Sequence, residues 1–408
     1  MTDVLPDDDA AAGQSARELL MAHRVTRLAS SVVRDLLAMT QRPALISFAG
    51  GLPAPDLFDV AGLGLAFERA ITSDPRRVFQ YSPTEGSDQL RTSVAERLTR
   101  NRLPSEPDDV LITTGSQQAL ALTALALVDT GSTVLVEEPT YLAALQALQL
   151  AGARVVGVPS DEEGLEPAAL ERVVKRERPA ALYLVPNFAN PTGKTLSAPR
   201  RVAIARLAHE HGFWVIEDDP YGELRFEGEA HAPLSSLPEA ADRSVYLGSF
   251  SKIGAPGLRL GWLRAPEALR RVVCVIKQSI DLHTSTVDQA AATWYLQSGR
   301  IDPHVELLRA KYAGRRNAML GALGELMPPG TTWNKPEGGM FVWLRLKGDV
   351  DTAEVLPRAL SSNVAFVPGA AFYSSSPDRA TMRLSFATHP PREIVEGLRR
   401  LALVLGAG

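Results

Sequence analysis

From Val110 onward, short runs of apolar residues alternate with segments of helical length. The runs are VLITTGS, TVLVEEP, ARVVGVP, AALYLVP, FWVIEDDP, SVYLGSF and GLRLGWL. The segments that we expect to be helical include 117–128, 143–150, 167–176 and 199–211. Apolar, β-branched strands that alternate with helices are typical of a parallel sheet covered on both faces. The pattern therefore predicts an α/β fold with a mostly parallel, seven-stranded sheet.

The two ends of the chain have a different pattern. Residues 16–40 have the apolar spacing of amphipathic helices, and 46–58 breaks into Gly and Pro turns. After about Gln297 a helix-rich stretch precedes GMFVWLRL, VAFVPG and TMRLSFA, which predict a smaller α+β domain. We expect a disordered N-terminus over 1–15, an N-terminal arm over 16–59 that joins the small domain, a large domain over 60–296 and a small C-terminal domain over 297–408.

Composition and charge narrow the class of protein. Lys and Arg number 43 against 47 Asp and Glu, a net charge of −4 that gives no reason to expect a nucleic acid or an anionic membrane as partner. The one cysteine, Cys274, excludes an internal disulfide framework and a Cys-based zinc cluster. The first residues, MTDVLPDDDAAAG, are acidic, and no apolar run approaches the ~18 residues of a membrane span. We expect a cytoplasmic protein.

Polar residues follow five of the predicted strands. These strand ends are 114–117, 137–141, 186–193, 218–221 and 249–252. Taken singly, each has a structural explanation, such as a helix cap at Ser116, a turn at 190–193 or a solvated Lys252. In open α/β sheets, however, ligands bind beyond the carboxyl ends of the strands. Because polar groups occur at successive strand ends, the sequence predicts one binding site there.

The sequence lacks the complete motifs of several other enzyme classes. Gly193-Lys194-Thr195 resembles the end of a nucleotide-binding GxxxxGK[ST] loop, but Phe188 stands where that loop needs glycine. The SxxK of acyl-serine hydrolases occurs at 249–252 without SDN or KTG. Neither GxSxG nor HExxH is present. We expect no metal site.

Eight segments, in their order and spacing, carry a family resemblance. They are YSPTEG, TTGSQQAL, EEPTY, PNFANPTG, EDDPY, GSFSKIGAPGLRLGW, PEGGMFVW and MRLSFA. From about Arg27 to the C-terminus the chain resembles class I/II aminotransferases that depend on pyridoxal 5'-phosphate (PLP) and have fold type I. SFAGGLPAPDLF is similar to the branch with 2-aminoadipate and broad-specificity aromatic or branched-chain aminotransferases, and to the aminotransferase-like halves of some transcription regulators.

The resemblance implies an activity and its catalytic residues. The large domain would bind PLP, and the enzyme would move the amino group of an L-α-amino acid to a 2-oxo acid by a ping-pong mechanism, with 2-oxoglutarate as the expected acceptor. Lys252 would form the Schiff base with the cofactor and act as general acid and base. Asp218 would keep the pyridine nitrogen protonated, with Tyr221 beside it. Asp219 and Glu217 are the alternatives to Asp218, because a shift of one residue along a strand points the side chain to the other face.

The resemblance also implies a set of cofactor ligands. Asn190 and Tyr221 would reach the phenolic oxygen of the ring, and Tyr141 would stack on the ring face. The phosphate ligands would be Gly115, Ser116, Gln117, Ser249, Ser251 and Arg259, the first three at the start of a helix. In the family a tyrosine of the neighbouring subunit also reaches the phosphate, and Tyr81 is its counterpart. The resemblance therefore implies a homodimer with shared active sites.

The expected substrate contacts centre on one arginine. Arg383 would bind the α-carboxylate as a bidentate guanidinium, with Gly51 and Asn190 beside it. Without the resemblance, a salt bridge at a sheet edge would be the simpler role for Arg383. Arg34, in SSVVRDLL, would either bind the far end of a dicarboxylic substrate or face solvent on an amphipathic helix.

Two other hypotheses stay open at this point. The chain could be an effector-binding module with an aminotransferase fold, although no winged-helix pattern precedes the matched region. It could also catalyse another PLP reaction, as a β-lyase, a decarboxylase or an oxidase, because fold does not fix reaction.

Overall fold

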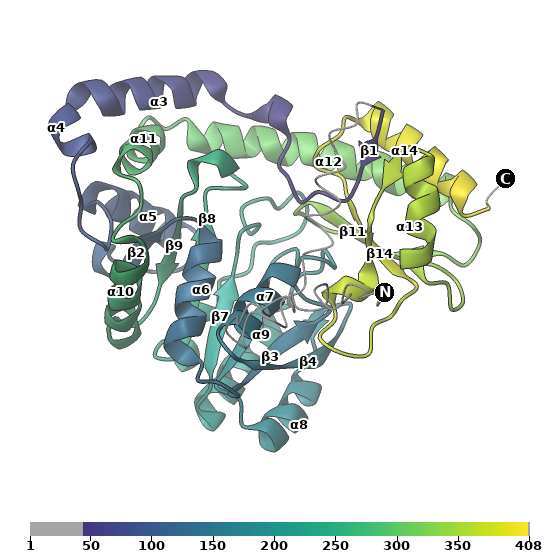
Figure 1. Cartoon of the computed structure of the whole chain (residues 1–408), viewed down its shortest axis with the longest axis horizontal. Helices are drawn as coiled ribbons and strands as arrows, with labels where there is room; N and C mark the ends of the chain where they lie inside the picture. The colour runs from purple at the N-terminus through teal and green to yellow at the C-terminus, as the bar shows by residue number, and fades with distance from the viewer. Residues whose placement is uncertain (1–43, 407–408) are drawn as a thin grey trace, which may run out of the picture.

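The computed structural model describes residues 44–406, and its largest element is an eight-stranded sheet (Figure 1). The strand order is β2-β9-β8-β7-β6-β3-β4-β5. The strands are β2 (Val110–Thr113), β3 (Thr133–Glu138), β4 (Arg154–Asp161), β5 (Gly164–Leu165), β6 (Ala181–Leu184), β7 (Trp214–Asp218), β8 (Ser244–Ser249) and β9 (Gly261–Arg264). β4, β3, β6, β7 and β8 run parallel, and β9 is antiparallel to β8 and β2. The seven predicted strands are confirmed, and the two-residue β5 extends the sheet beyond β4.

Both faces of this sheet are covered by helices. The helices are α5 (Asp88–Arg100), α6 (Ser116–Leu127), α7 (Leu142–Leu150), α8 (Pro167–Glu177), α9 (Ala198–His211) and α10 (Glu267–Asp281). On β6, Leu182 and Leu184 share a core with α8 and α9, while Tyr183 shares a core with α6 and α7. This alternation follows from the two-residue period of a strand. At the end of β7, Glu217 and Asp218 therefore point to opposite faces.

A second, smaller sheet is formed by the C-terminal part of the chain. Its order is β10-β11-β14-β13, and all neighbours are antiparallel. The strands are β10 (Thr332–Trp333), β11 (Phe341–Arg345), β13 (Val367–Pro368) and β14 (Thr381–Ser385), with helices α13 (Thr352–Ser361) and α14 (Pro391–Val404) beside them. The run VAFVPG divides between two sheets, because β12 (Val364–Ala365) pairs with β1 (Ile46–Ser47) instead. The segment that precedes the large sheet in the sequence thus lies against the C-terminal elements.

Helices link the two sheets. α3 (Val60–Ser73), α4 (Pro75–Val78) and α11 (Thr286–Gln297) lie beside the large sheet, and α12 (Ile301–Leu326) runs from them to α14, as Figure 1 shows. Short 3₁₀ helices are η1 (Pro55–Leu57), η2 (Pro107–Asp109), η3 (Leu234–Ser236), η4 (Pro238–Ala240), η5 (Pro256–Leu258) and η6 (Gly369–Phe372). Within 44–406, no helix has the length and hydropathy needed to span a membrane. The predictions for 1–15 and for helices over 16–40 lie outside the described residues.

Candidate active site

Lys252 follows β8 and reaches across to the segment that precedes α3. Its Nζ lies 2.9 Å from the carbonyl oxygen of Gly51. Burial lowers the pKa of this amine to about 8, and the guanidinium groups of Arg383 and Arg259 add to the shift. Because a neutral amine is the nucleophilic form, the surroundings of Lys252 favour its reaction with an aldehyde.

The three carboxylates at the end of β7 have different partners. Glu217 accepts hydrogen bonds from the backbone of Leu234 and Ser235 at 2.8 Å each. Asp219 accepts from the Asn187 amide at 2.9 Å and from the backbone N–H of Gly222 at 2.9 Å. On Asp218, in contrast, Oδ1 is buried without a partner. Of the three, Asp218 alone has an oxygen left for a ligand.

Tyr183 supports Asp218 from the neighbouring strand. Its hydroxyl donates a hydrogen bond to Oδ2 of Asp218 at 2.8 Å, on the α6 side of the sheet. Burial raises the pKa of Asp218 to about 7, the Tyr183 hydrogen bond lowers it and the charge of Asp219 raises it. A cation beside Oδ1 would favour the ionised carboxylate. Sequence reasoning missed Tyr183, because a tyrosine inside an apolar strand is usually a core residue.

Arg383 lies in the middle of the small sheet, on β14 between β11 and β13. Its guanidinium donates to Oδ1 of Asn190 at 2.7 Å and to the carbonyl of Ala49 at 2.5 Å, while its buried Nε has no partner. No carboxylate in the described part of the chain pairs with it, so a sheet-edge salt bridge does not explain it. Burial lowers its pKa to about 10. An unpaired, buried guanidinium is a strong receptor for a carboxylate.

The Arg383 guanidinium lies over the rings of Phe341 and Phe372, two residues that were not predicted from the sequence. The ring centroids of Phe341 and Phe372 lie 4.4 and 5.1 Å from the guanidinium carbon of Arg383. The Phe341 ring also makes an edge contact with Tyr221 at 5.8 Å. Phe341 belongs to the motif GMFVW, which could have drawn attention to it, whereas Phe372 has no comparable signal. Cation–π contact keeps the arginine in place without neutralising it.

Asn190 connects Arg383 to the aromatic residues of the site. Its amide oxygen accepts from Arg383, and its side chain is hydrogen bonded to the Tyr221 hydroxyl. Burial raises the pKa of Tyr221, with the phenol of Tyr141 as the next cause. Burial also raises the pKa of Tyr141 to about 12, and the charges of Asp218, Arg383 and Arg259 act on it. The structure thus brings Tyr141, Tyr221 and Asn190 together between the carboxylate and the guanidinium.

The turn before α6 lies beside the loop after β8. Gly115 is the N-cap of α6, with φ +82°, and it offers no side-chain cap. A Cβ at Gly115 would lie 2.7 Å from Nη2 of Arg259, so this guanidinium lies directly against the turn. Ser249 donates to the Ser251 hydroxyl at 2.8 Å in the adjoining loop. The uncapped N–H groups of α6, these hydroxyls and Arg259 form a cradle for an anion.

The chemistry of these side chains and backbone groups fits each part of PLP. The unpartnered oxygen of Asp218 suits a protonated ring nitrogen, the amine of Lys252 suits the aldehyde, and the cradle at Gly115 suits the phosphate. Gln117 lies on the outer side of the same turn, where its Oε1 is 3.5 Å from the Tyr141 hydroxyl. The structure therefore places these predicted cofactor ligands close together, with the exception of Tyr81.

Two of the residues noted in the sequence, Tyr81 and Cys274, lie apart from this group. Tyr81 is 78% exposed and packs its ring against His283, with centroids 5.7 Å apart. Arg34 lies outside the described residues. Cys274 is on α10, where burial raises its pKa to about 11, and it has no place in the cluster.

Comparisons with known proteins agree with this geometry. The family model for aminotransferase class I and II matches residues 63–401. A 2-aminoadipate transaminase of Thermus thermophilus is 44% identical, covering 93% of this chain and 94% of that protein. Aromatic-amino-acid aminotransferase 1 of Thermococcus litoralis is 39% identical, covering 94% of each. The crystal structure of LysN, the alpha-aminoadipate aminotransferase of Thermus thermophilus, has a TM-score of 0.88 at 40% identity and covers 95% of this chain and 97% of that one.

The chain belongs to the class I and II aminotransferases. It is a PLP-dependent enzyme of fold type I that transfers an amino group from an amino acid to a 2-oxo acid. The predicted family, fold, cofactor and activity are confirmed.

Proposed function

We propose that Lys252, Asp218 and Arg383 each have a separate role in transamination by this enzyme. The observation that carries the proposal is the unpartnered oxygen of Asp218, which the Tyr183 hydrogen bond leaves free beside the two active-site phenols. When bound, PLP supplies an aldehyde that takes up the amino group and a protonated ring that accepts electrons. Lys252 would hold the aldehyde, and Asp218 would keep the ring protonated. Asn190 and Tyr221 would donate to the ring's phenolic oxygen, with Tyr141 against its face.

Substrate orientation would depend on Arg383. Its guanidinium would hold the α-carboxylate of the amino acid. Asn190, which accepts from Arg383, and Gly51, whose carbonyl accepts from Lys252, would line the same place. With the carboxylate fixed, one face of the substrate Cα would lie toward Lys252. Once the substrate's amino group has taken the place of Lys252 at the aldehyde, the released amine of Lys252 would take the Cα proton as a general base and give a proton back as a general acid.

We also propose that the enzyme is a homodimer, in which Tyr81 serves the partner's phosphate site. Exposed apolar side chains lie along α3, α10 and α11 and in the segment that joins α4 to α5. They include Val60, Phe79, Tyr81, Val275, Ile280 and Trp294. An exposed apolar surface of this kind is typical of a protein interface. The expected location is the cytoplasm, and the expected division is a PLP-binding domain over 60–296 with a small domain built from both ends.

The activity test uses a panel of amino acids with and without 2-oxoglutarate. We expect acidic, aromatic and aliphatic donors to yield their 2-oxo acids and to convert the cofactor to its amino form when no acceptor is present. Keto-acid formation without that conversion would indicate an oxidase, and loss of CO₂ would indicate a decarboxylase. A β-lyase would release the group at Cβ of the substrate. Any of these three results would contradict transamination.

The dimer is tested by sedimentation and by mixing two inactive variants. Lys252→Ala removes the amine, and Tyr81→Ala removes the contact to the partner. A mixed dimer would contain one site with an intact Lys252 and an intact Tyr81 from the other chain. We therefore expect activity to return on mixing; a monomer, or no return of activity in a proven mixed dimer, would contradict shared sites.

A further inference from the structure

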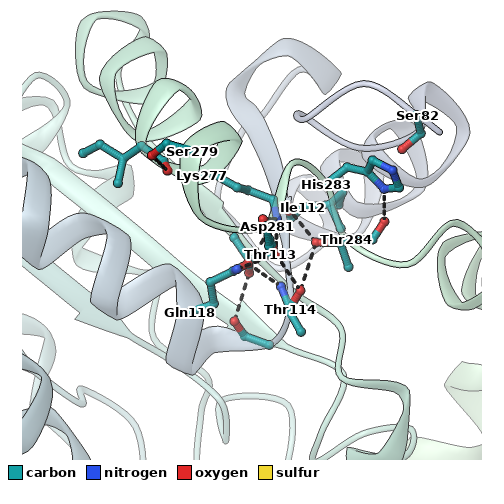
Figure 2. Close-up of polar contacts among 12 residues, drawn as sticks. Ser82, Ile112, Thr113, Thr114, Gln118, Lys277, Ser279, Asp281, His283 and Thr284 are labelled. Atoms are coloured by element: carbon teal, nitrogen blue, oxygen red, sulfur yellow. Dashed lines mark hydrogen bonds and ion pairs between the residues drawn. The ribbon is translucent and has the colours of Figure 1, made fainter.

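A buried ion pair lies behind the phosphate cradle and has no part in the site described above. Lys277 of α10 has a fully buried side chain, and its Nζ lies 2.8 and 3.0 Å from the two carboxylate oxygens of Asp281. Burial lowers the pKa of Lys277, and Asp281 partly offsets that shift. Figure 2 shows both side chains turned toward the start of α6.

The pair is joined to the cradle by the side chain of Gln118. Its Nε2 donates to Asp281 at 2.6 Å, and its Oε1 accepts from Lys277 at 3.2 Å. The same Oε1 accepts from the backbone N–H of Thr114 at 2.8 Å. The Thr114 hydroxyl also donates to Asp281 at 3.3 Å. Side chains of α10 therefore hold Thr114, at the start of the turn, and Gln118, directly after it.

The Thr114 hydroxyl makes a second contact that holds the turn. The Thr114 hydroxyl lies 3.4 Å from the hydroxyl of Thr284, in the loop that follows α10 (Figure 2). The carbonyl of Thr284 in turn accepts from the Gln289 amide at 2.8 Å. The turn at Gly115 thus rests on a network of side chains that are not among the predicted phosphate ligands.

Stability alone does not account for this arrangement. Burying a lysine is costly, and an apolar pair of similar volume is often as stable as a buried ion pair or more so. Fixed geometry is a better reason, since the N–H groups of a cradle bind an anion best when they already point at it. Gly115, with its left-handed backbone, is the residue in this turn that most needs outside support.

We propose that Lys277, Asp281 and Gln118 are positioning residues that hold the turn from Thr114 to Gln117 in the shape that receives the cofactor's phosphate. The proposal rests on the proposed function, because it takes Ser116 and Arg259 as phosphate ligands. It predicts that loss of the network weakens binding through the phosphate and leaves the rest of the cofactor site intact.

The test compares PLP with pyridoxal, which lacks the phosphate, as ligands of the cofactor-free protein. Apparent Kd values are measured by absorbance titration, and the pyridoxal-to-PLP ratio of Kd isolates the phosphate contribution. The variants are Lys277→Met/Asp281→Leu, which makes the pair apolar, and Gln118→Met, which removes the link but keeps the pair. We expect the ratio to fall by about tenfold in both, equivalent to about 1.4 kcal/mol, with the Kd for pyridoxal unchanged.

Control variants distinguish failure of the positioning role from failure of the proposed phosphate site. Val273→Ala on α10 removes packing from a fully buried side chain that lies outside the network, so it should lower the melting temperature without moving the ratio. Ser116→Ala and Arg259→Ala test the phosphate ligands themselves. If these two lower the ratio and the network variants do not, the positioning role is wrong and the proposed phosphate site stands. If none of the variants lowers the ratio, the proposed phosphate site is wrong, and the positioning role with it.

Discussion

The Tyr183 hydroxyl donates to one oxygen of Asp218 at 2.8 Å and leaves the other oxygen, also buried, without a partner. The hydrogen bond fixes the rotation of the carboxylate, so the free oxygen points to one place. It also counters the effect of burial on the pKa of Asp218. The pair therefore combines orientation with charge at the point where a ring nitrogen would bind.

Tyr183→Phe should lower kcat by about tenfold, because a buried hydrogen bond to a carboxylate contributes about 1.5–3 kcal/mol. KM for the amino acid should change little, since Tyr183 lies behind the carboxylate. Steady-state kinetics at saturating PLP would show this. Tyr246→Phe is the matched control, because its hydroxyl donates to Asp219 at 3.2 Å. Equal losses of kcat in the two variants would contradict the role of Tyr183.

Asp218→Asn and Asp219→Asn should separate catalysis from stability. An amide at 218 cannot hold a protonated ring nitrogen by charge, so we expect kcat to fall by about 10²-fold or more. An amide at 219 disturbs the hydrogen bonds from Asn187 and Gly222, so we expect a loss of about 1–3 kcal/mol in unfolding free energy with kcat nearly unchanged. Kinetics and urea denaturation measure the two effects. The reverse pattern would move the ring-nitrogen role to Asp219.

Cofactor capture by the cofactor-free protein should depend on the pKa of Lys252. The folded pKa is lowered from 10.5 to about 8, so the neutral, reactive amine should appear as pH rises through about 8. The unfolded chain binds more protons between these two values, and this group should therefore make folding more favourable with rising pH across that window. Stopped-flow absorbance with PLP gives the rate. A midpoint near 10.5 would show that burial and the two arginines do not act on Lys252.

Arg34→Ala should raise KM for acidic donors more than for leucine. The prediction comes from the sequence, where Arg34 in SSVVRDLL would either bind the far end of a dicarboxylic substrate or face solvent on an amphipathic helix. A guanidinium near the far end of the substrate would bind a second carboxylate and would contribute little to an apolar side chain. Comparing kcat/KM for glutamate, 2-aminoadipate and leucine in wild type and variant tests it. Equal effects on glutamate and leucine would place Arg34 in solvent.

Much of the fold and the outline of the site could be predicted from the sequence. The seven apolar runs predicted the seven main strands, because the strands of a parallel sheet covered on both faces are apolar throughout. Lys252 and Asp218 lie in motifs at predicted strand ends, whereas Arg383 lies inside a strand and its role was predicted from the family resemblance alone. The choice between Asp218 and its two neighbours, however, depends on which face each side chain takes and on partners far away in the sequence.

The residues that sequence reasoning missed are those that act through another side chain. Tyr183 lies in an apolar strand, and Lys277 lies on an amphipathic helix where a lysine is usually solvated. Tyr183 is 35 positions from its partner Asp218, and Lys277 is 4 positions from its partner Asp281. Gln118 joins the pair of Lys277 and Asp281 on α10 to the start of α6. The i,i+4 spacing of Lys277 and Asp281 allows an ion pair on a helix, but the burial of Lys277 and its contact with Gln118 arise only when the chain is folded.

The half-reaction of Lys252→Ala with an amino-acid donor tests the central claim most directly. Wild type and variant, both loaded with PLP, are mixed with donor and no acceptor, and the cofactor's absorbance and the 2-oxo acid formed are followed together. We predict one 2-oxo acid per site in wild type, reversal on adding 2-oxoglutarate, and at least about 10³-fold slower conversion in the variant despite bound cofactor. Conversion at the wild-type rate by Lys252→Ala would contradict the assignment of Lys252 as the catalytic amine.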